Sequence, residues 1–206
     1  MSNRIKLSLN CRRIPTVTDN LSFMHECLKE FFAKLPEPWR VELSGSPNAE
    51  AGDLVAVCKV SRKGKFSGEV CYPIRNNEYL RNEAQFDDTL NLDFSANEDE
   101  LRYFANDIFP ELVSCFRSYR AEVSTKELAR SDWLKIVLHT REAGSDIYGR
   151  CGVYRVWPLS YYSATILNKI PTSLSFEPFG SGFMSRNIEH YLNNSVESYG
   201  KIEVNS

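Results

Sequence analysis

Apolar and polar residues alternate along much of the first half of the chain, and this pattern predicts strands around one helix. Every second residue of Arg4–Asn10 is apolar, which is typical of a half-buried strand. Thr18–Leu35 instead places its apolar residues at helical spacing, with Thr18 or Asp19 available as a cap and Pro36 directly after it. We therefore expect a strand followed by a helix.

A hairpin is expected next. Asp53–Val60 and Phe66–Ile74 both have extended character, and the basic, glycine-containing segment Ser61–Lys65 separates them. Thr89–Phe94 again has its apolar residues on one side, so it predicts a further strand.

A helix with a proline inside it is predicted after these strands. Ser95 followed three residues later by Glu98 fits a capping box, and apolar residues at helical spacing follow. Pro110 either kinks this helix or opens a second one.

In the last third of the chain the apolar patterns are shorter, and they predict short strands and helices. Trp133–His139 and Gly152–Trp157 are predicted strands, Ser160–Lys169 and Arg186–Leu192 are predicted helices, and Asn193–Ser206 is a predicted polar tail. The elements do not alternate as strand and helix along the chain. The expected fold is therefore a single α+β domain spanning residues 1–206, with helices packed against a mixed or antiparallel sheet.

Composition places the chain among ordinary packed proteins and favours a cytoplasmic location. It has 206 residues, 42% of them hydrophobic, and its first ten residues lack the apolar run of a signal peptide. No apolar stretch is long enough to span a membrane. The six cysteines are scattered without a CxxC pair, so they are expected to be reduced thiols.

Motifs for metal, nucleotide or nucleophilic chemistry are absent from the sequence. His25-Glu26 begins like the zinc motif HExxH, but position 29 is a lysine. There is no phosphate-binding loop, no GxGxxG and no GxSxG motif. No catalytic residue, metal ligand or cofactor is assigned on this basis.

Charge is distributed unevenly. The chain carries a formal net charge of −2, yet Asn76–Glu111 holds ten acidic residues against two arginines, a net −8, which leaves +6 for the rest. Such a window is either a solvated face or a docking surface for a basic protein. The candidate partner-binding carboxylates are Asp87, Asp88, Asp93, Glu98, Asp99 and Glu100.

Aromatic residues and arginines gather in Tyr148–Tyr162. These residue types dominate interface hot spots, and a core strand leading into a helix is the alternative interpretation. Tyr154 and Trp157 are the candidate partner-binding residues from this segment. Direct binding of nucleic acid is disfavoured, because no run of more than two basic residues occurs.

Asp107–Trp133 followed by Val153–Tyr162 resembles a segment pair seen in immunity proteins of bacterial polymorphic-toxin systems. The resemblance covers about a third of the chain and includes no diagnostic motif. It implies a cytosolic protein that binds a cognate toxin tightly and covers its active site. In that case the acidic window would face a basic toxin such as a nuclease.

The leading interpretation is a non-enzymatic binding protein, specifically an immunity protein that acts through an acidic surface. Two alternatives stay open. One is an enzyme whose site assembles from dispersed cysteine, histidine and acidic residues, and the other is a structural or regulatory subunit that self-associates through Tyr148–Tyr162.

Overall fold

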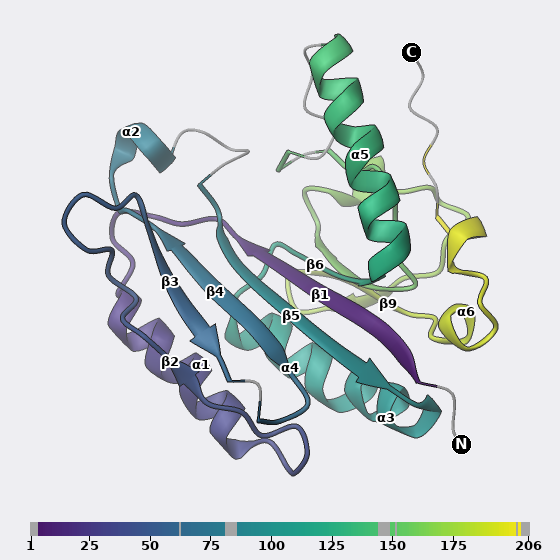
Figure 1. The fold of residues 1–206 in the computed structure, drawn as a ribbon. Coiled ribbons are helices and arrows are strands. Elements are labelled where there is room, and N and C mark those ends of the chain that lie inside the picture. Colours follow the sequence, from purple (N-terminus) through teal and green to yellow (C-terminus); the bar gives the residue numbers. More distant parts are fainter. Residues whose placement is uncertain are drawn as a thin grey trace.

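A single antiparallel sheet organises the protein (Figure 1). The computed structural model describes residues 4–61, 63–80, 86–143, 149–150, 152–200 and 202. Within these ranges nine strands pair in the order β2-β3-β4-β5-β1-β6-β7-β9-β8, and every pairing is antiparallel. Their bounds are β1 Ile5–Arg13, β2 Leu43–Ser44, β3 Val55–Val60, β4 Ser67–Pro73, β5 Asp88–Ala96, β6 Arg120–Thr125, β7 Leu159–Ser163, β8 Glu177–Phe179 and β9 Gly182–Arg186.

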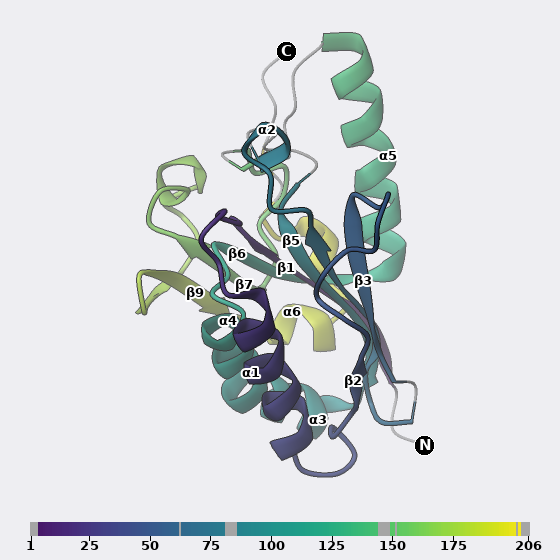
Figure 2. The same cartoon turned by 90° about the vertical axis from the view of Figure 1, so that its left-hand side faces the viewer.

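Helices lie on both faces of the sheet, so the predicted α+β class is confirmed, with an antiparallel sheet. Figure 2 shows α1 and α4 on one side of the sheet and α5 on the other. The helices are α1 Leu21–Lys34, α2 Asn77–Leu80, α3 Glu98–Tyr103, α4 Phe109–Cys115, α5 Lys126–Ala143 and α6 Glu189–Leu192. A π-helical turn, Phe104–Ile108, joins α3 to α4, and short 3₁₀ turns occupy Leu167–Lys169 and Val196–Ser198.

The main core lies between the sheet and the layer of α1, α3 and α4. Alternate residues of the central strands are fully buried there, among them Leu7, Leu9, Leu90 and Leu92. Aromatic rings from the helices and loops pack onto them, with Phe94 and Phe104 only 4.5 Å apart between ring centroids. Burying one such side chain contributes roughly 1.5–3 kcal/mol, so this layer holds the sheet to its helices.

The predictions for the first half of the chain are largely confirmed. The first strand, the helix after it, the β3–β4 hairpin and the β5 strand all form. The cap of α1 differs from the prediction, because Asn20 accepts the amide of Phe23, whereas Thr18 or Asp19 was expected to do so. Pro110 lies in the first turn of α4, where its missing N–H breaks no hydrogen bond.

Trp133–His139 is helical, so the predicted strand is wrong. It belongs to α5, which buries Asp132 and Ile136 against the rest of the protein. A short apolar run fits either a strand or a buried helical segment. The residues before it, from Lys126 to Ser131, are mostly good helix formers, and a helix that has begun there extends cooperatively through the run.

Gly152–Trp157 and Ser160–Lys169 also differ from their predictions. The first is not a sheet strand, because its backbone pairs with the C-terminal segment through Val156 N–H and the carbonyl of Gly200. The second begins as β7, which is hydrogen-bonded to β6 and β9 on its two sides. Two strand neighbours satisfy backbone groups that the predicted helix would have satisfied internally.

The C-terminal segment is more than a polar tail. Val196 and Tyr199 are buried, and the carbonyls of Glu197 and Tyr199 accept hydrogen bonds from Arg155. Arg155 in turn is bound to Asp132 of α5. Residues 196–199 therefore help to fix the segment that faces α5.

The capping box at α3 is shifted from its predicted position. Asn97, and not Ser95, accepts the amide of Glu100, while the Glu100 carboxylate accepts the amide of Asn97. Ser95 is still part of β5, so its backbone follows the sheet.

Replacing Asn97 by alanine should therefore lower the free energy of unfolding by about 1 kcal/mol, because the first turn of α3 loses its cap. The matched change Ser95→Ala should cost less than about half of that. Urea denaturation of both variants measures the difference. Equal losses would contradict the observed cap.

Candidate functional site

The second face of the sheet is polar at its centre. The side chains that alternate with the buried leucines of β1 and β5 are serine, asparagine and aspartate. β4 and β6 continue this character with serine and glutamate. This face is the one on which α5 lies (Figure 2).

Strand register arranges these polar side chains in two rows that cross four strands. In one row, Glu69 of β4 pairs with Asn91, Asn91 with Asn10, and Asn10 with Glu122 of β6. The Asn10 amide donates to the Asn91 carbonyl oxygen at 2.5 Å. That hydrogen bond uses one donor and one acceptor of the pair, so the remaining amide groups can bind a further partner.

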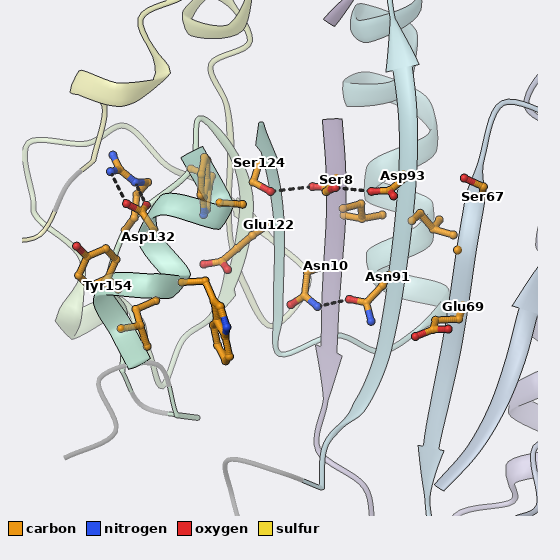
Figure 3. Close-up of a pocket in the computed structure, with 18 residues that line it drawn as sticks. Ser8, Asn10, Ser67, Glu69, Asn91, Asp93, Glu122, Ser124, Asp132 and Tyr154 are labelled. Carbon is orange, nitrogen blue, oxygen red and sulfur yellow. Dashed lines mark hydrogen bonds and ion pairs between the residues drawn. The ribbon is translucent and has the colours of Figure 1, made fainter. Parts of the chain in front are cut away.

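The second row runs beside the first. Ser67 pairs with Asp93, Asp93 with Ser8, and Ser8 with Ser124. Figure 3 shows hydrogen bonds linking Ser124, Ser8 and Asp93 across the strands.

These rows form the floor of a pocket of about 540 Å³. Its wall consists of Ala129, Trp133 and Ile136 of α5 together with Tyr154, Arg155 and Trp157. The lining combines four carboxylates, from Glu69, Asp93, Glu122 and Asp132, with one guanidinium, from Arg155. Lys126 and Lys59 lie beside Asp93 and Glu69, so the four carboxylates face three cations and the pocket keeps an excess of one negative charge.

The four carboxylates are held in place by other side chains of the protein. Glu122 accepts the hydroxyl of Tyr162 at 2.6 Å, and Asp132 binds Arg155 through both of its oxygens.

The two carboxylates nearer solvent have lysine partners. Asp93 lies 2.7 Å from Lys126, and Glu69 binds Lys59. These carboxylate side chains remain 47% and 36% exposed, so they can still attract a ligand.

The four carboxylates of the pocket are spread over three strands and α5. Glu69 and Glu122 are three strand spacings apart, which corresponds to roughly 14 Å between backbones. Glu69 and Asp93 are closer, because they are diagonal neighbours on adjacent strands at roughly 7–8 Å, and each of them is paired with a lysine. Among the described residues that line the pocket there is neither a histidine nor a cysteine.

Three of the cysteines are unsuited to thiol chemistry. The five described cysteines are free thiols, while Cys151 lies outside the described residues. Burial raises the pKa of Cys11 to about 12, and it raises those of Cys58 and Cys115 to about 11. Such thiols remain protonated at neutral pH and are poor nucleophiles.

The described part of the chain holds no group of three or more histidine, cysteine, aspartate or glutamate residues arranged to bind a metal ion. None of the helices described there is long and apolar enough to cross a membrane.

The acidic window does not gather on one outer surface, contrary to the expectation from the sequence. Asp87 and Asp88 are buried at one end of the sheet. Asp93 lies on the sheet face and lines the pocket.

The three acids of α3 lie apart from this pocket, in the first turn of the helix. Glu98 pairs with Arg102, and Glu100 pairs with Arg4 and Lys65. Asp99 is exposed. Of the six candidate carboxylates, only Asp93 therefore joins the pocket.

Asp87 and Asp88 are neutralised by arginines that come from distant parts of the chain. Asp88 is bound through both oxygens by Arg75 at 2.8 Å and also by Arg13. Burial raises the pKa of the Asp88 carboxyl, against the lowering effect of these two arginines.

Asp87 has an equally dense set of partners. It binds Arg12, Arg150 and the hydroxyl of Tyr119. These contacts tie the end of β1 to the start of β5, and they connect both to residue 150. The role of Asp87 and Asp88 is therefore structural.

Tyr154 and Trp157 do line the pocket, although both are largely buried. Sequence reasoning missed Glu69, Asn10, Asn91 and Glu122, which form the first polar row. A signal was present for part of it, because polar residues alternate with leucines in both β1 and β5. Trp133 was missed because its segment was predicted to be a strand.

No protein-family model and no curated protein matches the chain. Among solved structures it is similar to the Pseudomonas aeruginosa T6SS protein PA0821, with 12% sequence identity and a TM-score of 0.48. The match covers 98% of this chain and 79% of that one. At this level of similarity, function has to be argued from the site itself.

Removing the Asp88 charge should destabilise the protein strongly. Asp88→Asn leaves Arg13 and Arg75 with Asp19 as their remaining carboxylate, so we expect a loss of about 3 kcal/mol in the free energy of unfolding. Asp99→Asn, at an exposed position of the same window, should change it by less than about 0.5 kcal/mol. Chemical denaturation measures both, and a small loss for Asp88→Asn would contradict the structural role.

His25, which begins the incomplete zinc motif, is a buried residue of α1. Its Nδ1 lies 3.4 Å from the Tyr72 hydroxyl, and the two rings pack edge to face. Burial lowers the pKa of His25 below its usual value. The unfolded chain therefore takes up a proton at a higher pH than the folded one.

Stability should consequently fall as pH drops through the unfolded histidine pKa of about 6.5. His25→Gln should show a smaller loss between about pH 7.5 and 5.5, because glutamine does not titrate in this range. Thermal or urea unfolding across the range compares the two proteins. Identical pH dependence would show that His25 does not carry the effect.

Proposed function

We propose that the chain is a non-catalytic binding protein that neutralises a cognate toxin by covering part of it with the polar sheet face beside α5. The observation that carries this proposal is the pocket itself. It combines a floor of carboxylates and amides with an aromatic wall, and its carboxylates are already fixed by neighbouring side chains. A fixed site loses little side-chain entropy when a partner binds, which favours tight association.

The segments that resemble immunity proteins contribute to this same site. Asp107–Trp133 includes Glu122, Ser124, Asp132 and Trp133, and Val153–Tyr162 includes Tyr154, Arg155 and Trp157. The two segments also bind each other through Asp132 and Arg155. This convergence supports the immunity interpretation over a subunit that associates with itself.

The charge of the pocket favours a basic partner. Nucleases hold the phosphates of their substrate with lysine and arginine side chains. An acidic face that meets those side chains blocks substrate and also accelerates association. A toxin with a cationic active-site cleft, such as a nuclease, therefore fits the site.

Co-expression with the product of a neighbouring toxin-like gene tests this proposal. The chain should restore growth of cells that produce the toxin, and the two proteins should co-purify with a dissociation constant below about 1 μM. A toxin of unrelated sequence serves as the control. Absence of both protection and a complex would contradict the proposal.

A further inference from the structure

An exposed apolar ridge on α5 adjoins the negatively charged pocket. Trp133, Leu134 and Leu138 are 57%, 58% and 54% exposed, although they are large apolar side chains. Leu134 and Leu138 are one helical turn apart, and Trp133 also lines the pocket. Large apolar side chains exposed together typically mark an interaction surface.

The pocket calls for a positively charged partner group. Its four carboxylates outnumber the three cationic side chains that bind them, because Arg155 pairs with Asp132, Lys59 with Glu69 and Lys126 with Asp93. The partly exposed Glu69 and Asp93 belong to neighbouring rows on adjacent strands. A cation that enters at this point meets both carboxylates and the amide groups of the floor.

We propose that the occupant of this site is a basic segment of the toxin that presents arginines to the two polar rows and an apolar side chain to the α5 ridge. This inference rests on the proposed function and specifies its contact chemistry. Glu122 is only 2% exposed, so the carboxylates that a partner can reach are Glu69 in the first row and Asp93 in the second. One arginine for each row gives the segment two cationic groups.

Arginine fits better than lysine for a geometric reason. Its planar guanidinium donates in parallel to a carboxylate or amide and stacks on an aromatic ring. The pocket wall already contains such an arrangement, in which Arg155 binds Asp132 and lies 5.6 Å from the centre of the Trp157 ring. Trp133 offers an equivalent ring that is still open to solvent.

Two sets of variants test the site on the whole protein. The first comprises the double change Glu69→Gln with Asp93→Asn, and the single change Trp133→Ala. The matched controls lie on α1, on the opposite face of the sheet (Figure 2), and replace residues of the same kind: Glu26→Gln with Glu30→Gln, and Phe23→Ala. All of these side chains are at least partly exposed, so the variants should fold, which circular dichroism checks.

Each pocket variant should weaken toxin binding at least about tenfold, and the double variant should also reduce its salt dependence. The α1 controls should stay within about twofold of the unchanged protein. If the pocket variants bind the toxin as tightly as the controls do, the inference is wrong, while the proposed function stands on another surface.

If no toxin is bound at all, the proposed function fails and a peptide titration decides the inference alone. The probe is a short acetylated and amidated peptide with two arginines and a leucine, and its twin carries citrulline in place of arginine. Trp133 reports binding by fluorescence, because its ring is exposed beside the pocket. The Trp133→Phe variant separates its signal from that of Trp157, which also lines the pocket.

The arginine peptide should give a saturable change, and this change should be at least about tenfold weaker for the citrulline twin and for the Glu69→Gln, Asp93→Asn variant. Equal responses to the two peptides, or no response to either, would overturn the inference.

Discussion

The pairing of β1 with β5 on one side and β6 on the other is the constraint on which the rest of the structure depends. The β1–β5 register is continuous over nine residue pairs, from Ile5 with Ala96 to Arg13 with Asp88. Because side chains alternate between the faces, a shift of one residue would exchange the buried leucines with the polar rows. The core and the candidate site are therefore fixed by the same hydrogen bonds.

The buried ion pairs act at one end of this register. Asp87 and Asp88 stand where β5 begins, and their partners Arg12 and Arg13 stand where β1 ends. A slipped strand would leave these charges buried without partners, at a cost of several kcal/mol. The acids that dominate the charge of the sequence window thus help to specify strand alignment.

Sequence patterns predicted the elements that have one clearly apolar face. β1, α1, the β3–β4 hairpin and β5 each have one apolar face, and each forms where it was expected. The Trp133–His139 part of α5 was predicted as a strand because an isolated apolar run has the same composition in a helix and in a strand. β7 was missed because its exposure pattern depends on strands β6 and β9, which lie on either side of it only in the folded chain.

The candidate site was predictable only in part for a similar reason. Acids that are neighbours in sequence, such as Asp88 and Asp93, end up buried and exposed respectively, because strand geometry sends them to different environments. Their arginine partners come from other elements, and no local pattern reveals that pairing. Tyr154 and Trp157 were identified by residue type, whereas Glu69 and Glu122 joined them only through the sheet register.

The place of β1 has a consequence for the order in which the molecule assembles. This strand comes first in the chain, yet its two neighbours begin at Asp88 and Arg120. Contacts between such distant parts of a chain form slowly, because a long loop must close before they are made. Until then both edges of β1 are open to pairing with other molecules, so the chain is most prone to aggregate before β5 and β6 have paired with it.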